Sequence, residues 1–171
     1  MIVQLTADDV QQHLPEFIEL IQDSVNGGAS VGFIAPLEHQ EAADYWSHVI
    51  DNMQAHGLDL LAAIENDKII GSVQLAPVPK ANGQHRADVQ KLLVHSHWRR
   101  QKIGEQLMQA IETHALNLGR WLLVLDTERG SGAQYLYEKL GYVQSGIIPQ
   151  YVTGNAGEYL DTVVFYKALK G

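Results

Sequence analysis

One segment constrains the fold of this chain more than any other, because it joins a strand to a helix through a short basic turn. The run RADVQKLLV, residues 86–94, alternates along a predicted strand. The alternation predicts one face with Asp88, Gln90, Leu92 and Val94 and an opposite face with Ala87, Val89, Lys91 and Leu93. Apolar residues then recur at helical spacing from about residue 103 to about residue 118, and Gly119 ends the predicted helix. The chain is therefore expected to pack helices against a sheet.

The remaining residues predict further strands and helices around this segment. Strands are expected at residues 1–5, 58–65, 69–76, 121–126, 142–148 and 158–166. Helices are expected after Thr6, over 38–56 and near 133–140, with Pro15 dividing or kinking the first. Residues 26–33 indicate a flexible loop, and Asn66 with Asp67 forms a hairpin signal. These elements predict one α/β (α+β) domain over residues 1–171.

The amino-acid composition excludes several classes of protein. The 171 residues contain no cysteine, which excludes disulfides, thiolate metal sites and a cysteine nucleophile and favours a cytoplasmic protein. No targeting segment is expected at the N-terminus, and no apolar run is long enough to cross a bilayer.

Charge is distributed unevenly along the chain. The net charge of -8 argues against binding to nucleic acid. Residues 1–67 hold 12 acids and no Lys or Arg, whereas residues 68–171 hold 8 acids and 12 bases. This division favours an anionic ligand on the C-terminal half and a cationic one near the N-terminal half. A solvated acidic surface is the alternative interpretation.

The basic turn after residue 94 is suited to binding an anion. Backbone N–H groups around Gln101–Glu105 are expected to converge at the helix N-terminus, where the helix dipole favours negative charge. Arg99, Arg100 and Lys102 add positive charge there. Gly104 is expected to let the backbone approach a ligand because it has no Cβ. A diphosphate is therefore the expected ligand.

The common nucleotide-binding loops do not match this turn. The sequence contains neither G-x-x-x-x-G-K-[ST] nor G-x-G-x-x-G followed by an acid beyond the next strand, which argues against a nucleotide hydrolase or a dehydrogenase. The basic residues could instead form a solvated run of charge without a ligand. Cations at a helix start oppose the helix dipole, however, and this mismatch favours a bound anion.

Two motifs in this order resemble those of the GNAT superfamily of N-acyltransferases. The first, Arg/Gln-x-x-Gly-x-Gly/Ala after a strand, is met at Arg99, Lys102 and Gly104, with Lys102 in place of the usual glycine. The second, A-x-x-L-Y-x-K-x-G-F/Y, is matched by Ala133, Leu136, Tyr137, Lys139, Gly141 and Tyr142. The segments GGASVGF, NGQHRADVQKL and LDTERGS further resemble a member of the superfamily that acetylates a β-lactam amino-acid toxin.

The resemblance implies a fold, an acyl donor and a reaction. The implied fold is a mixed, mostly antiparallel twisted sheet of about seven strands, splayed between strands four and five and flanked by about four helices. The implied donor is acetyl-CoA, and the implied reaction is direct attack on it, in a ternary complex, by the primary amine of a small molecule such as a toxin or antibiotic. A homodimer is also compatible with the resemblance. Acetylation of protein N-termini or lysines, and a non-catalytic acyl-CoA sensor, remain as alternatives.

Three residues are candidates for catalysis. An alkyl amine is protonated at neutral pH, so a base must deprotonate it, and Asp88 and Asp126 are candidates alongside a water relay. Asp88 could instead pair with Arg86 or Lys91, and Asp126 could cap the following segment. By resemblance, Tyr137 would protonate or hydrogen-bond the departing CoA sulfur; a core tyrosine is the alternative.

Residues expected to bind the two substrates follow from the same motifs. The donor is expected to contact Leu92, Leu93, Val94, Arg99, Arg100, Gln101, Lys102, Ile103, Gly104, Glu105, Ser131, Ala133 and Tyr137. A backbone N–H near Leu93 or Val94 is expected to bind the oxyanion. The acceptor is expected to contact Val31, Gly32, Phe33, Gln90 and Tyr151, the last in a loop between the final two strands. His95 and His97 have no evident third partner, so no metal is expected.

Overall fold

The computed structural model describes residues 1–170, in which seven strands form one sheet in the order β1-β2-β3-β4-β5-β7-β6. The strands are β1 (Ile2–Leu5), β2 (Asp59–Glu65), β3 (Lys68–Pro77), β4 (Arg86–Val94), β5 (Leu122–Glu128), β6 (Val143–Thr153) and β7 (Tyr159–Ala168). Neighbouring strands are antiparallel except for the parallel pair β4 and β5. The predicted mixed, mostly antiparallel sheet is therefore confirmed.

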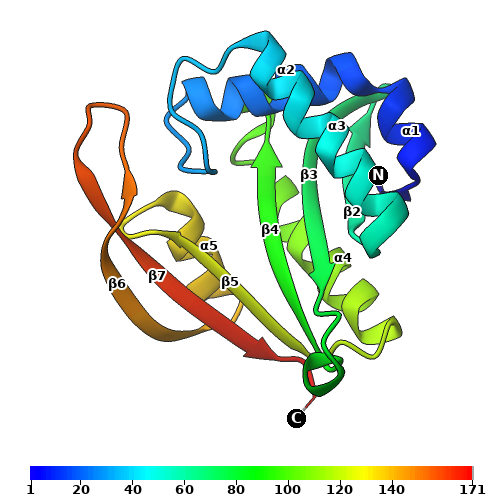
Figure 1. Cartoon of the computed structure of the whole chain (residues 1–171), viewed down its shortest axis with the longest axis vertical. Coiled ribbons are helices and arrows are strands. Elements are labelled where there is room, and N and C mark those ends of the chain that lie inside the picture. Colours follow the sequence, from blue (N-terminus) through cyan, green and yellow to red (C-terminus); the bar gives the residue numbers. More distant parts are fainter. Residues whose placement is uncertain (171) are drawn as a thin grey trace.

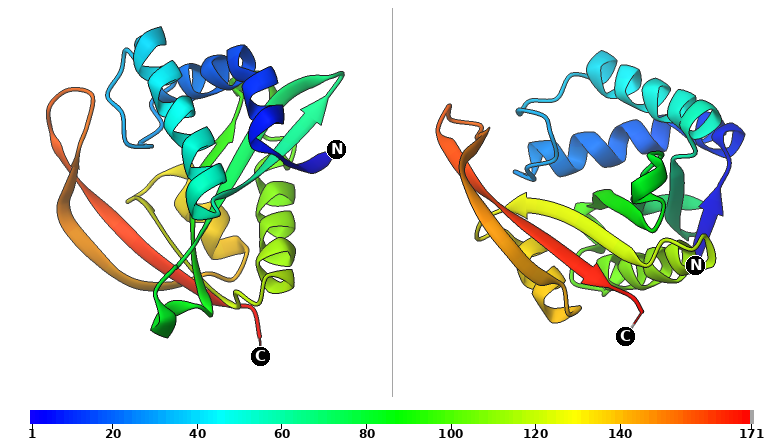
Figure 2. Two further views of the ribbon diagram at one scale, coloured as in Figure 1. Left: turned by 45° about the vertical axis from the view of Figure 1, so that its right-hand side comes forward. Right: turned by 60° about the horizontal axis from the view of Figure 1, so that its bottom comes forward.

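Helices cover both faces of the sheet (Figure 2). They are α1 (Ala7–Gln12), α2 (Leu14–Asn26), α3 (His39–His56), α4 (Ile103–Asn117) and α5 (Gly132–Lys139), with short 3₁₀ turns η1 (Ala81–Gly83) and η2 (Ser96–Trp98). One buried cluster lies under α1, α2 and α3 and contains Phe17 and Trp46. A second lies under α4 and α5 and contains Ile111 and Phe165. Across residues 1–170, no helix is long and apolar enough to span a membrane.

Short-range signals set the ends of the N-terminal elements as predicted. Thr6 accepts from the backbone N–H of Asp9, whose carboxylate accepts from the N–H of Thr6 in return, a reciprocal cap that starts α1. Pro15 lies in the first turn of α2, where a missing N–H costs nothing, so the chain divides at His13. Gly57 ends α3 with a φ of 68°, a conformation that glycine adopts without strain.

The sheet opens between β4 and β5 (Figure 1). Among residues 1–170, only Arg86–Asp88 of β4 pair with β5, through Leu122–Val124. The rest of β4 continues beside β3, while the rest of β5 continues beside β7. The predicted splay between the fourth and fifth strands is confirmed, and it leaves one edge of residues 89–94 without a strand partner in the described chain.

The predicted alternation along β4 holds only as far as Gln90. The pairing with β3 shifts between Ser72 and Gln74, and Lys91 has a φ of 52°, which marks a β-bulge. Val89 packs in the cluster under α4 and α5, whereas Leu93 packs in the opposite cluster under α1 to α3. The prediction that Val89 and Leu93 share a face is wrong, because the extra residue of the bulge inverts every later side chain.

Candidate active site

The turn before α4 presents backbone N–H groups as the sequence predicted. Within residues 1–170, no protein acceptor bonds the N–H groups of residues 101–105, and the first bond of the helix is from Gln106 N to Lys102 O at 3.0 Å. No side chain of the described residues caps this helix end. These N–H groups carry the positive end of the α4 dipole, so the turn fits a diphosphate.

Lys102 holds the turn in the conformation that glycine usually supplies. Its φ of 63° and ψ of 12° lie in the left-handed region, and Arg100 two residues earlier has a φ of 62°. The departure from glycine therefore keeps the turn geometry, at a conformational cost of roughly 1–2 kcal/mol for an L residue. Gln101 and Ile103 complete the turn and the start of the helix.

Two of the predicted donor-site residues, Gly104 and Arg99, lie against other protein groups. A Cβ built on Gly104 would lie 3.4 Å from Leu136 Cδ2 and 3.7 Å from Val94 Cγ2, so the Cβ side of this position faces α5 and β4. The Arg99 side chain turns back onto the chain, where Nε donates to Val94 O at 3.2 Å and Nη2 lies 4.0 Å from Asp23 Oδ2.

The negative charge of Glu105 beside the turn is paired with a lysine. Its carboxylate binds Lys139 Nζ at 2.6 Å, which joins α4 to α5. This bond is the main reason that the pKa of Glu105 lies below its ordinary value.

Of Leu93 and Val94, the two residues whose N–H could bind the oxyanion, only Val94 directs its backbone groups toward the opening between β4 and β5. His95 N donates to Ile70 O in β3 at 2.9 Å. Hydrogen-bonded pairs recur every second residue in an antiparallel ladder, so Leu93 is also hydrogen-bonded to its β3 partner, Ser72. The backbone groups of Val94 then point away from β3, toward the splayed edge. Leu92 and Val94 direct their side chains into the cluster under α4 and α5.

Tyr137 lies on α5 and is buried, with 6% of its surface exposed. Burial raises the pKa of its hydroxyl, and the charge of Asp126 raises it further, so the phenol stays protonated at neutral pH. Ser131 starts α5 by accepting from Gln134 N at 3.2 Å, and Ala133 packs in the adjoining cluster. The helix therefore holds a protonated donor close enough to Asp126 to sense its charge.

Asp88 and Asp126 lie on the two strands that splay apart. Desolvation raises the pKa of Asp88; Arg86 lowers it and Asp126 raises it again. The raised pKa is the direction expected of a base that must accept a proton. Thr162 Oγ1 lies 3.2 Å from Asp126 Oδ2 and 2.9 Å from Thr127 O, so these two oxygens compete for its single hydroxyl proton.

The loop between α2 and α3 covers the sheet beside these acids. Val31 O accepts from Lys91 Nζ, and the ring centroid of Phe33 lies 5.4 Å from the same nitrogen. A Cβ on Gly32, where φ is 92°, would lie 2.9 Å from it, so the loop fits closely over β4. Ala35 N donates to Asn155 Oδ1 at 2.8 Å, which joins this loop to the turn between β6 and β7. The three predicted residues Val31, Gly32 and Phe33 thus gather at one place.

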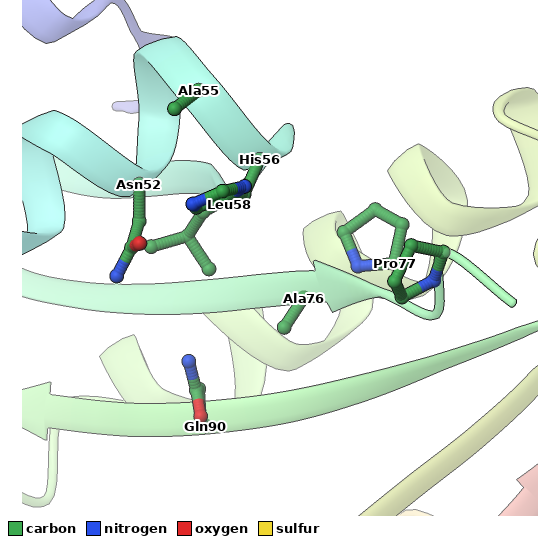
Figure 3. Close-up of a pocket in the computed structure, with 8 residues that line it drawn as sticks. Asn52, Ala55, His56, Leu58, Ala76, Pro77 and Gln90 are labelled. Carbon is green, nitrogen blue, oxygen red and sulfur yellow. The ribbon is translucent and has the colours of Figure 1, made fainter.

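The structure has two cavities to compare with the other predicted acceptor residues, and residues of this loop line only the second of them. Gln90 lines a cavity of about 430 Å³ between the end of α3 and strands β3 and β4 (Figure 3). A second cavity, of about 470 Å³, is lined by Gly32, Phe33, Val152 and Thr153 among others. Tyr151 is not among the residues that line either cavity. Tyr151 lies within β6, because that strand extends to Thr153 and the observed loop is shorter than the predicted one. Its side chain is 55% exposed.

Lys91 and Tyr45 also shape this site, although neither was predicted to do so. The Tyr45 ring centroid lies 5.6 Å from Lys91 Nζ, and its hydroxyl accepts from Gln74 Nε2 at 2.8 Å. No residue type marks this β-bulge, so nothing in the sequence indicated that Lys91 would turn toward the loop. His95 and His97 lie with ring centroids 5.0 Å apart, and residues 1–170 contain no group of three side chains placed to hold a metal.

Solved structures of known proteins share this arrangement of strands and helices. The structure resembles a ribosomal-protein-alanine N-acetyltransferase from Brucella melitensis, with a TM-score of 0.82 at 20% identity over 99% of each chain. It resembles a putative acetyltransferase from Salmonella typhimurium, solved with its cofactor acetyl-CoA, with a TM-score of 0.78 at 16% identity over 100% of this chain and 94% of that one. It also resembles an aminoglycoside 6'-acetyltransferase type Ii, with a TM-score of 0.74 at 18% identity over 100% of this chain and 98% of that one. These likenesses show the fold.

The family follows from the sequence match. Residues 56–144, just over half of the chain, match the acetyltransferase (GNAT) domain family, and this range holds β4, the basic turn, β5 and Tyr137. The chain therefore belongs to the GNAT family of N-acetyltransferases, enzymes that use acetyl-CoA as the acyl donor.

Proposed function

We propose that this enzyme transfers the acetyl group of acetyl-CoA to the primary amine of a small molecule, by direct attack in a ternary complex. The observation that carries the proposal is the set of N–H groups at residues 101–105, which within residues 1–170 have no protein acceptor. They lie at the end of a β4 edge that has no strand partner beyond Asp88 in the described chain. A diphosphate at the turn and a pantetheine arm along β4 would bring the thioester toward Asp126 and Tyr137.

Residues of both splayed strands and α5 supply the chemistry. The Val94 N–H binds the oxyanion that forms when the amine attacks the thioester carbon. A carboxylate of Asp88 or Asp126, or a water beyond one of them, takes the amine proton as the C–N bond forms. Tyr137 donates a proton to the sulfur as the C–S bond breaks. Its raised pKa keeps the hydroxyl protonated until that step.

A small acceptor is favoured over a protein substrate by one contact. The bond from Ala35 N to Asn155 Oδ1 ties the loop over β4 to the β6–β7 turn, across the side of the opening where the acceptor would enter. A protein N-terminus or lysine would need an open groove there. The resemblance of three segments to the tabtoxin resistance protein, which acetylates a β-lactam amino-acid toxin, favours the same class of acceptor.

The test measures transfer and donor binding separately. Purified enzyme with acetyl-CoA should release free thiol in the presence of some members of a broad panel of small amines, and titration calorimetry should detect CoA binding. Thiol release with peptides but with no small amine would identify a protein acetyltransferase. CoA binding with unchanged turnover in Tyr137→Phe and Asp126→Asn would contradict the proposed roles, and absence of both CoA binding and thiol release would contradict the function.

A further inference from the structure

The cavity between α3, β3 and β4 lies on the same face of the sheet as the two candidate bases. The buried cluster under α4 and α5 takes alternate residues of β4 and β5, namely Ala87, Val89, Leu123 and Leu125. Because side chains alternate along a strand, Asp88, Gln90 and Asp126 lie on the opposite face, the one that α1 to α3 cover. The cavity is on that face, since Gln90 and residues of α3 extend into it (Figure 3).

The strand register places this cavity beside Asp88. Asp88 pairs with Ala76 of β3, which lines the cavity, and Gln90, the next residue of β4 on the same face, also lines it. On its other side Asp88 pairs with Val124 of β5, so Asp126 follows two residues later, where the strands splay. A molecule in the cavity therefore has Asp88 at its edge and Asp126 on the next strand.

The cavity is lined by apolar and uncharged polar side chains. Its apolar lining consists of Ala55, Leu58, Ala76, Pro77 and Pro79. The polar lining comes from Asn52 and His56 in the last turns of α3 and from Gln90, and within residues 1–170 no Asp, Glu, Lys or Arg lines it. A carboxamide has both a donor and an acceptor. An uncharged amide or hydroxyl matches such a lining, whereas a charged group would lose hydration there without gaining a counter-ion.

A buried partner orients the Gln90 side chain. Gln74, its pair in β3, is 1% exposed and accepts from Gln90 Nε2 at 3.4 Å, while Gln74 Nε2 donates to the Tyr45 hydroxyl at 2.8 Å. The side-chain oxygen of Gln90 accepts no hydrogen bond from residues 1–170, and the side chains of Asn52 and His56 make none with them. All three side chains are therefore free to bind a ligand, and Gln90 is already held in position.

We propose that this cavity binds the body of the acceptor, and that Asn52, His56 and Gln90 select an acceptor with an uncharged amide or hydroxyl beyond its primary amine. The amine lies at the Asp88 edge of the cavity, on the face that both acids share. The volume of about 430 Å³ is within the range of sites for small molecules. This inference rests on the proposed function and adds a binding site and a class of acceptor to it.

The first test blocks the cavity. Ala55 lines it from α3, and the neighbouring Gln54 is also exposed but does not line it. Ala55→Trp should lower kcat/KM for the best amine of the panel about tenfold or more and leave KM for acetyl-CoA little changed, whereas Gln54→Trp should leave both unchanged. Unchanged kcat/KM in Ala55→Trp would overturn the inference while leaving acetyl transfer established. No thiol release by the wild-type enzyme with any amine would instead refute the proposed function.

The second test compares matched acceptors with the wild-type enzyme. ω-Amino amides and ω-amino alcohols are assayed beside ω-amino acids and n-alkylamines of equal length, with thiol release as the readout. We expect kcat/KM for the best amide or alcohol to exceed that for its acid and its alkylamine about tenfold, the effect of one or two neutral hydrogen bonds. Equal or higher kcat/KM for the acid or the alkylamine, at every length, would overturn the inference.

Variants of the polar lining connect the preference to the cavity. Asn52→Ala and Gln90→Ala should each reduce the preference for the amide or alcohol severalfold. A preference that both variants keep in full would show that the selection is made elsewhere, and would overturn the inference. Thermal melts establish that each variant is folded, and if Ala55→Trp is not, the wild-type ratios decide.

Discussion

Asp23 in α2 binds Ser96 twice, accepting from the backbone N–H at 2.7 Å with one carboxylate oxygen and from the hydroxyl at 2.7 Å with the other. Ser96 begins η2, which leads to the proposed donor site, and α2 leads into the loop beside the proposed acceptor site. Arg99 Nη2 lies 4.0 Å from the same carboxylate. A single acid therefore ties together the segments that flank the two proposed substrate sites.

Removing this acid should weaken donor binding. Asp23→Ala frees the turn from α2, so we expect KM for acetyl-CoA to rise about tenfold, since hydrogen bonds to a charged group are worth about 1.5–3 kcal/mol. KM for the acceptor should change less. Steady-state kinetics with each substrate varied in turn measures both effects. A rise confined to the acceptor KM would show that Asp23 does not act on the donor turn.

The same carboxylate makes stability depend on pH. Desolvation works to raise the pKa of Asp23, but the two bonds from Ser96, with His95 and Arg99, lower it below the ordinary 3.8. Because its pKa is lower in the folded state, the Asp23 carboxylate stabilises the fold fully above pH 3.8. This stabilisation is lost as the pH falls through the folded-state pKa. Urea unfolding should therefore show a larger difference between wild type and Asp23→Asn at pH 7 than at pH 3. A difference that grows at pH 3 would contradict the assignment.

Lys102 should be a strained position. Lys102→Gly removes the left-handed strain, and Lys102→Ala removes the charge but keeps the strain. We expect the glycine variant to be more stable than the alanine variant by about 1 kcal/mol. Chemical unfolding of the two proteins measures this difference. Equal stability would mean that residue 102 is not left-handed in solution.

Replacement by alanine should destabilise the fold at Gly71 but leave it unchanged at Gly104. A Cβ on Gly71 would lie 2.8 Å from Leu93 O and 3.1 Å from Leu107 Cδ1, so Gly71→Ala should destabilise the fold by about 1–3 kcal/mol. A Cβ on Gly104 meets its nearest neighbour at 3.4 Å, an ordinary contact. Gly104→Ala should keep both stability and CoA affinity, and it serves as the matched control. A loss of stability in Gly104→Ala as large as that in Gly71→Ala would contradict this difference between the two positions.

Tyr137 should affect the rate more than binding. Tyr137→Phe removes only the hydroxyl, which makes no hydrogen bond to another side chain within residues 1–170, so the fold should be unchanged. We expect kcat to fall about a hundredfold, within the range of proton-transfer catalysis, with KM for acetyl-CoA little changed. Steady-state kinetics and a thermal melt together test this. An unaltered kcat would leave Tyr137 as a core residue only.

Local signals are enough to predict the order of the elements. The Thr6 cap, Pro15, Gly57 and the apolar spacing of α4 act over a few residues, so the sequence shows them directly. The turn before α4 is predictable for the same reason, because strand, basic residues and helix are adjacent in the chain.

Sequence-based prediction fails where distant segments decide the geometry. The bulge at Lys91 depends on the pairing of β4 with β3, and it determines which face Leu93 occupies. The Cβ side of Gly104 meets Leu136 from α5, a contact that the sequence motif does not reveal. Tyr151 is predicted to lie in a loop, but β6 pairs with β7 as far as Thr153. None of these partners is close in sequence, so periodicity could not reveal them.

The most direct test is a nuclear magnetic resonance titration of the backbone amides with CoA and, separately, with pantetheine, which lacks the diphosphate. We expect CoA to shift the amide resonances of residues 101–105, and we expect pantetheine to leave them in place while shifting those of β4 near Val94. Amides at 101–105 that do not respond to CoA, or that respond equally to pantetheine, would contradict it.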